Sequence, residues 1–122
     1  MKIDMIGGKM SVLGNLKTAL KSVCPEVAMD VYYGDADVYI VYNVAAEQPG
    51  GFRDDAPAVN EMYFQVHLFV PLNKNYLNMQ KAIKTALFLS GFSYPKVALN
   101  TVERDVKKRH ICYETNIAES EV

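Results

Sequence analysis

The segment over residues 61–71 constrains the fold more than any other part of the sequence. It reads EMYFQVHLFVP, so that Met62, Phe64, Val66, Leu68 and Val70 alternate with Tyr63, Gln65, His67 and Phe69. A period of two places these two sets on opposite faces of a β-strand. The proline that follows cannot donate a hydrogen bond to a neighbouring strand. The sequence therefore predicts a strand over residues 61–70 with one strongly apolar face.

Four further segments have strand character. Residues 27–33 alternate between apolar and other side chains, and Gly34–Asp35 is a plausible tight turn after them. Residues 37–44 are β-branched or aromatic on both faces, which is typical of a central strand covered on both sides. Residues 96–104 and 109–115 are predicted to form the last two strands, joined by a charged turn.

Two segments have helical periodicity. Apolar residues recur every three or four positions over residues 8–24, and Pro25 disfavours helical geometry in the residue before it. A second helix is predicted to be capped by Asn73 or Asn75 and to end before Gly91. The order α-β-β-β-α-β-β predicts an α+β fold, with a mainly antiparallel sheet of about five strands and both helices on one face.

The size and composition limit the class of protein. A chain of 122 residues has room for a single domain spanning residues 1–122, and 50% hydrophobic residues can form its core. A net charge of -1 argues against a dedicated nucleic-acid binder. The apolar runs are too short to cross a membrane, and we expect no signal peptide. Cys24 and Cys112 are expected to be buried thiols rather than a disulfide.

Residues 47–60 (EQPGGFRDDAPAVN) are predicted to form a long, mobile loop, because such Pro-, Gly- and acid-rich connections exceed the usual hairpin length. Asp54 and Asp55 within it could contact a calcium ion, although solvated loop acids are far more common. The polar residues 118–122 are expected to be frayed.

No catalytic, cofactor or metal site is predicted. His67 and His110 are the only histidines, and no pair of His or Cys residues has the spacing of metal ligands. His67 could act as a general base, and His110 could form a nucleophilic pair with Cys112. The favoured interpretation is that these residues are ordinary strand residues with local hydrogen bonds. We therefore expect the protein not to be an enzyme.

One basic cluster stands out, formed by Arg104, Lys107, Lys108, Arg109 and His110. It could contact phosphate groups. A solvated turn, or charge pairing with an acidic loop of a neighbouring subunit, is the favoured interpretation.

The face of the sheet away from the helices is expected to carry many aromatic side chains. They are Tyr32, either Tyr39 or Tyr42, Tyr63, Phe69 and Tyr113. Such a face is larger than a solitary domain usually exposes, so it indicates a partner or self-association surface. A curved sheet that folds over its own aromatic residues is the alternative, and the sequence leaves both open.

Several segments together resemble a known group of proteins. They are YIVYN at residues 39–43, FRDDAP at 52–57, YFQVHLFVP at 63–71, GFSYP at 91–95 and KRHICYE at 108–114. This pattern, over about residues 37–115, resembles small proteins of the tail-assembly regions of long-tailed phages and prophages of Gram-positive bacteria. These are tail-completion proteins, either tail terminators or tail-to-head joining proteins.

The resemblance implies a structural role in the virion. Such proteins have an α/β fold and form a ring, suspected here to be a hexamer, on the end of the tail tube. The ring would contact the tail tube protein and the head connector, with DNA only passing through and no membrane involved. The resemblance also implies assembly in the cytoplasm of the bacterial host and a final location in the tail or neck.

On this hypothesis, two groups of residues contact a neighbouring subunit or the tail tube. The loop group is Phe52, Arg53, Asp54 and Asp55, and the turn group, which could instead line the channel, is Lys107, Lys108 and Arg109.

Two alternatives come from other functional classes. A single-stranded nucleic-acid binder could stack bases on the aromatic face, with the basic cluster following the backbone. A small hydrolase or nuclease could use Asp54, Asp55 and His67.

Overall fold

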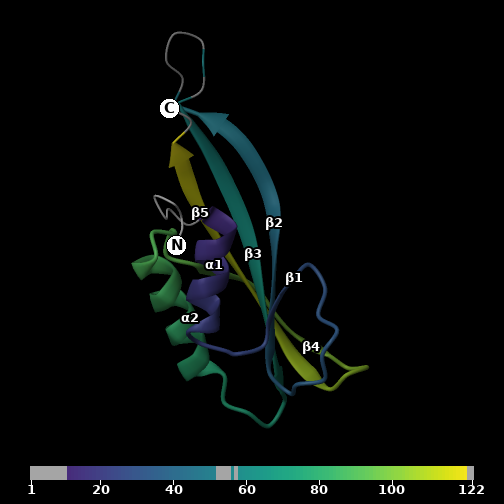
Figure 1. The fold of residues 1–122 in the computed structure, drawn as a ribbon. Helices are drawn as coiled ribbons and strands as arrows, with labels where there is room; N and C mark the ends of the chain where they lie inside the picture. The colour runs from purple at the N-terminus through teal and green to yellow at the C-terminus, as the bar shows by residue number, and fades with distance from the viewer. Residues whose placement is uncertain (1–10, 52–55, 57, 121–122) are drawn as a thin grey trace.

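The structure is a computed structural model that describes residues 11–51, 56 and 58–120. The elements in chain order are α1 (Val12–Lys21), β1 (Val27–Met29), β2 (Tyr39–Gly50), β3 (Val59–Pro71), α2 (Leu77–Leu89), β4 (Lys96–Glu103) and β5 (Lys108–Ser120). The strands form one sheet in the order β1-β2-β3-β5-β4, and both helices lie on the same side of it (Figure 1). The predicted α+β fold and element order are confirmed.

The sheet is mixed rather than wholly antiparallel. β2–β3, β3–β5 and β5–β4 pair antiparallel, but β1 pairs parallel with β2. The tight turn predicted at Gly34–Asp35 is therefore wrong as a hairpin connection. β1 ends at Met29, and Asp30 adopts a left-handed conformation with φ 64°. Residues 30–38 then lead the chain back to the end of the sheet at which β1 began, where β2 starts.

The central strands are longer than the sequence suggests. β2 pairs with β3 as far as Gly50 and Val59, so residues 47–50 and 59–60, predicted as loop, belong to a long hairpin. A bulge between Val44 and Ala46 shifts the register within it. β5 pairs with β3 through residues 118–120, which were expected to be frayed. These strand ends extend beyond the helices (Figure 1).

Local signals define the helix ends. The Ser11 side chain accepts a hydrogen bond from the Gly14 N–H and caps α1, which ends at Lys21, before the predicted Cys24. The Asn75 side-chain oxygen accepts from the Leu77 N–H at the start of α2. Gly91 follows this helix with φ 98°, a conformation that glycine adopts without a steric penalty.

The hydrophobic core lies between the helices and one face of the sheet. Leu16, Leu20, Ile83 and Leu87 of the helices pack there together with the buried strand residues Ile40, Tyr42, Phe64, Val66, Leu68, Val70, Ile111 and Tyr113. Tyr113 was expected on the opposite face, but it is fully buried and its hydroxyl donates to Gln80 on α2. Neither helix within the described residues is long and apolar enough to cross a membrane.

Candidate functional site

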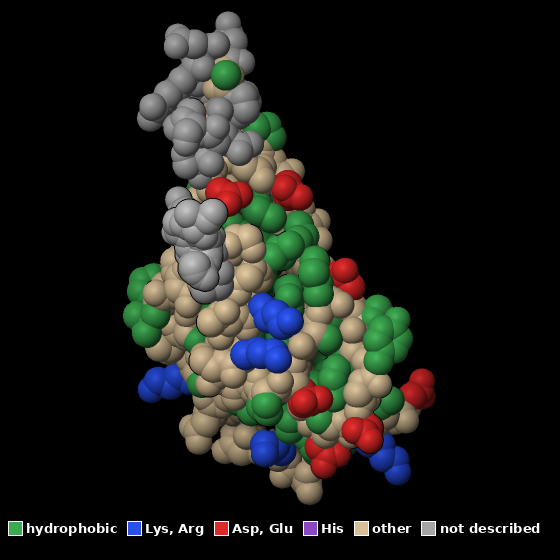
Figure 2. Space-filling view, viewed as in Figure 1, with side chains coloured by type: hydrophobic (Ala, Val, Ile, Leu, Met, Phe, Trp, Pro, Cys, Tyr) green, Lys and Arg blue, Asp and Glu red, His purple; other side chains and the backbone are tan. Residues whose placement is uncertain are grey.

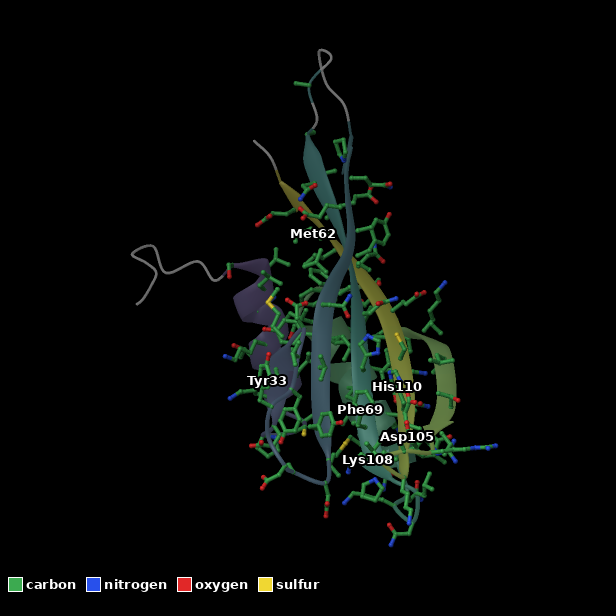
Figure 3. All side chains as sticks on the ribbon, turned by 90° about the vertical axis from the view of Figure 1, so that its right-hand side faces the viewer. Tyr33, Met62, Phe69, Asp105, Lys108 and His110 are labelled. Atoms are coloured by element: carbon green, nitrogen blue, oxygen red, sulfur yellow. The ribbon has the colours of Figure 1, made fainter. Side chains whose placement is uncertain are left out.

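The candidate site lies on the sheet face turned away from both helices. This open face consists of the alternate residues of β2, β3 and β5, namely Tyr39, Val41, Asn43, Gln65, His67, Phe69, His110, Cys112 and Glu114. Figure 3 views the molecule from this side, with Phe69 and His110 next to each other near the middle of the sheet. Most of these side chains are half-buried although neither α1 nor α2 covers them.

Four rings form a continuous aromatic row across the open face. Tyr32 stacks on Tyr39 with centroids 4.1 Å apart, Tyr39 on Phe69 at 4.8 Å, and Phe69 on His110 at 4.4 Å. All three interplanar angles lie below 20°. The two inner rings are therefore covered on both of their faces and present mainly their edges to solvent.

A hydrogen-bonded histidine chain crosses the same face. It runs from Asn43 through His67 and His110 to Glu103. Nε2 of His67 lies 3.1 Å from the Asn43 side-chain oxygen, and Nδ1 of His67 lies 2.7 Å from Nε2 of His110. Nδ1 of His110 is 2.9 Å from a carboxylate oxygen of Glu103. Four strands, β2, β3, β5 and β4, thus contribute one member each.

The partners determine where protons lie along this chain. The Glu103 carboxylate can only accept, so Nδ1 of His110 carries a proton; the Asn43 oxygen also accepts, so Nε2 of His67 carries one. One more proton is then needed for the 2.7 Å contact between the rings. With the Asn43 amide oriented as in the structure, the pair holds one positive charge; turning that amide makes both rings neutral.

The surroundings of His67 disfavour its charged form. Burial lowers the pKa of His67, and the charge of the adjacent His110 lowers it further. His110 lies against the Glu103 carboxylate, with its Nδ1 2.9 Å from the carboxylate oxygen.

The histidine chain and the aromatic row border a hollow of about 360 Å³. Asp30, Val31, Tyr32, Tyr39, Val41, Asn43, His67, Phe69 and His110 line it. Cys112 is paired in register with His67, but burial, with the nearby Glu114, raises the pKa of its thiol. A thiol of this kind is a poor nucleophile, because the reactive species is the thiolate.

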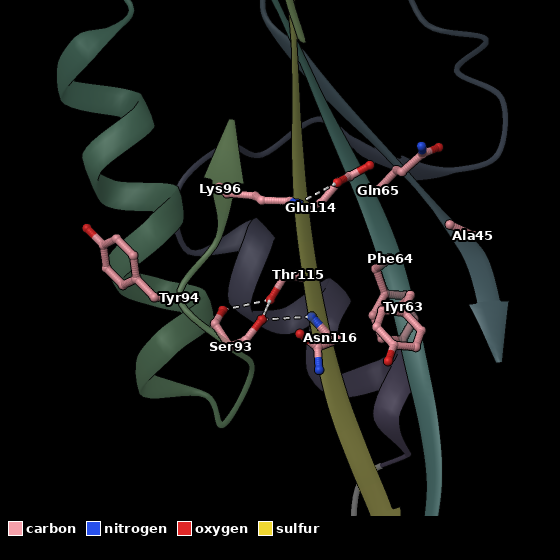
Figure 4. Close-up of a pocket in the computed structure, with 10 residues that line it drawn as sticks. All are labelled: Ala45, Tyr63, Phe64, Gln65, Ser93, Tyr94, Lys96, Glu114, Thr115 and Asn116. Atoms are coloured by element: carbon pink, nitrogen blue, oxygen red, sulfur yellow. Dashed lines mark hydrogen bonds and ion pairs between the residues drawn. The ribbon is translucent and has the colours of Figure 1, made fainter. Parts of the chain in front are cut away.

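A second hollow of about 470 Å³ lies where β4 begins, beside β5 (Figure 4). Its polar groups are joined to one another: Thr115 Oγ1 donates to the Ser93 carbonyl at 2.7 Å, and the Asn116 N–H donates to Ser93 Oγ at 2.9 Å. Lys96 and Glu114 form an ion pair at its rim. These bonds tie the α2–β4 connection to β5, which is a structural role.

The structure describes only some of the residues that the sequence grouped into sites. Phe52, Arg53, Asp54 and Asp55 lie outside the described residues, and so does the hypothetical calcium site. Both cysteines are free and buried, as predicted. Within the described part of the chain, no three His, Cys, Asp or Glu side chains gather as a metal site.

The three consecutive basic residues at the end of the β4–β5 turn and the start of β5 point in different directions. Lys107 is exposed, with φ 54°. Lys108 reaches across the open face to donate to the Asp37 carbonyl at 2.6 Å. Arg109 points to the other side, where it donates to Asn100 and lies over the Tyr76 ring at 5.3 Å.

Sequence reasoning missed the histidine chain. It considered each histidine with its neighbours along the strand, whereas their contact depends on the register between β3 and β5. That register pairs His67 with Cys112 and Phe69 with His110. The sequence did contain a signal: each of the two predicted strands carries one histidine, so the two rings could meet if the strands paired.

Comparison with known proteins gives a likeness of fold. No family model matches the sequence, and no curated protein matches it significantly. A solved structure known only by a sequence identifier is similar over 93% of this chain and 98% of its own, with 15% identity and a TM-score of 0.55. At this level of identity, the likeness concerns the fold alone.

Proposed function

We propose that this chain is a non-enzymatic structural subunit of a long-tailed phage or prophage. In this role it completes the tail tube and joins it to the head connector as a ring of identical copies. Its partners are other copies, the tail tube protein and a head connector protein, and DNA passes through the ring. Terminator and head-side adaptor are two forms of this one role.

The observation that carries the structural role is the open face. Its aromatic row and histidine chain hold the side chains in fixed positions without a covering layer. A half-buried, pre-organised surface with exposed aromatic edges is typical of a protein interface. The phage assignment itself depends on the sequence resemblance. Four of its five segments lie in β2, β3, β5 and the link after α2, and the fifth, at residues 52–57, lies almost wholly outside the described residues.

The geometry weighs against a single-stranded nucleic-acid binder, which is the alternative. Base stacking needs free ring faces. Tyr39 and Phe69 each use both faces within the aromatic row. In addition, Figure 2 shows basic and acidic side chains interspersed on the side it views, with no continuous basic surface.

The experiment that tests this proposal is electron microscopy of lysates after disruption of the gene in its phage or prophage. We expect filled heads separate from tails, and restoration of joined virions when the wild-type gene is supplied in trans. Overlong tails would identify a terminator, and tails of normal length an adaptor. Fully joined, normal virions without the gene would overturn the proposal. A salt-sensitive mobility shift with single-stranded DNA would then favour the alternative.

A further inference from the structure

We propose that copies of this chain join head to tail through opposite edges of the sheet, the β4 edge of one copy meeting the β1 edge of the next. The inference rests on the ring of the proposed function and names the surfaces that would close it. Four observations carry it. The β4 edge exposes apolar side chains, the β1 edge does so too, the two edges carry opposite charge, and they lie at the same height along the strands.

The β4 edge is apolar and unpaired. β4 is the outermost strand on its side and pairs only with β5 among the described residues. Val97, Leu99 and Val102 are 41%, 45% and 40% exposed along it. Exposed apolar side chains on an unpaired edge strand favour association, and the charged Lys96 and Glu103 lie at the two ends of β4.

The β1 edge is the apolar counterpart. Met29 and Val31 are 42% and 51% exposed, and Tyr33, in the connection after β1, is 92% exposed. Figure 3 places Tyr33 on one side of the sheet and Asp105, in the β4–β5 turn, on the other. A tyrosine so exposed is a suitable anchor, because tyrosine is enriched among the residues that dominate interface energies.

The two edges carry opposite charge. Residues 25–37 contain four acidic residues, Glu26, Asp30, Asp35 and Asp37, all exposed, and no lysine or arginine. Residues 96–109 contain five basic residues against two acidic ones, and four of the five basic residues lie at the β4 edge, because Lys108 reaches across the open face to Asp37. Arg104 and Lys107 are exposed, and neither has an ion pair within the described residues. Unlike edges therefore attract, whereas two β4 edges or two β1 edges would repel.

The two edges also lie at the same height along the strand direction. A single row of paired residues crosses all five strands, from Val27 through Ile40, Leu68 and Ile111 to Asn100. A contact between different surfaces repeats from copy to copy, and it closes into a ring when rotation alone relates the copies. Edges at one level allow this without a shift along the strands.

The test uses two variants, each altered at one edge. Arg104→Glu with Lys107→Glu makes the β4 edge acidic, and Val31→Ser with Tyr33→Ser removes the apolar anchors of the β1 edge. All four side chains are exposed, so both variants are expected to fold. The mass of each protein in solution is measured by light scattering and sedimentation over a series of concentrations.

We expect the wild type to associate beyond the dimer, and each variant alone to remain monomeric. A mixture of the two variants should form one-to-one dimers and nothing larger, because one intact β1 edge meets one intact β4 edge. Lys17→Glu with Lys21→Glu, on the exposed side of α1, is the matched charge control and should associate like the wild type.

Three results would overturn the inference: variants that associate like the wild type, a mixture that stays monomeric, or a wild type that is monomeric at every concentration. These results leave the tail role to be decided by the gene disruption. Conversely, normal virions after disruption would remove the tail role even if the edges join the copies as stated.

Discussion

The two faces of β3 belong to one backbone but are held in different ways. On the covered face, Phe64, Val66 and Leu68 are buried against the helices. On the open face, His67 and Phe69 alternate with them along the strand and are half-buried, with neither α1 nor α2 above. Their contacts run sideways within the face, by ring stacking and hydrogen bonds.

This comparison separates two sources of order. The covered face depends on filling volume, which many apolar side chains can do. The open face depends on ring orientation and on matched donors and acceptors, which few substitutions preserve. On a surface like the open face, the side chains already have fixed positions before a partner binds. The predictions below test whether the two faces differ as much as their contacts indicate.

The largest effect is expected on the covered face. Leu68→Ala leaves a cavity at a fully buried position and should lower the free energy of unfolding by about 2–5 kcal/mol, measured by urea denaturation. Leu72→Ala makes the same chemical change at an exposed position and should have an effect within about 0.5 kcal/mol. Equal effects for the two variants would contradict the assignment of the core.

A smaller effect is expected from the adjacent position on the open face. Phe69→Ala removes two stacked contacts, with Tyr39 and His110, and should lower the free energy of unfolding by about 1–3 kcal/mol. Phe69→Leu keeps the apolar contact without the stacking and should lose less. A loss for Phe69→Ala as large as that of Leu68→Ala would mean that the open face is packed like a core.

The histidine chain predicts a pH dependence with a definite sign. In the folded protein the pKa of His67 lies below its ordinary value of 6.5, because burial disfavours its charged form. In the unfolded chain His67 binds a proton near the ordinary value, so below it the unfolded state binds more protons. Stability should therefore fall as the pH drops from about 7 to 5.5, and the fall continues down to the lowered folded pKa.

His67→Gln removes this titration and can still hydrogen-bond to Asn43, so its stability should depend less on pH over that range. The measurement is urea denaturation of both proteins at a series of pH values. Parallel pH profiles for variant and wild type would contradict the role of His67, since groups other than His67 would then account for the slope.

Local patterns were sufficient for part of this architecture. The alternation assigned the side chains of residues 62–70 to their correct faces, and Gly91 was identified from residue type as the residue that follows α2. The cap of α2 was predicted at Asn73 or Asn75; Asn75 accepts from the Leu77 N–H, but the N-cap position is Tyr76. The element order then predicted helices on one side of the sheet. Each of these features depends on residues close together in the sequence.

The features that were missed depend on pairing between distant segments. A short β1 pairs parallel with β2, because Asp30 turns the chain away, and no local pattern distinguishes this from a hairpin. The phase of β5 places Tyr113 in the core and His110 on the open face. Asn43 and Glu103 join the histidine chain only through the registers of β2 and β4 with their neighbours.

The smallest effect is expected from the charged pair on the open face. Lys96 and Glu114 are 3.6 Å apart, but their side chains are 77% and 40% exposed. Water and salt screen such a pair, so Lys96→Ala should change the free energy of unfolding by only about 0–1 kcal/mol, and less at high salt. A double-mutant cycle with Glu114→Gln isolates the pair itself. A coupling above about 2 kcal/mol would mean that charges help to hold the open face. A coupling near zero, together with a clear loss for Phe69→Ala, would assign its order to the aromatic row and the histidine chain.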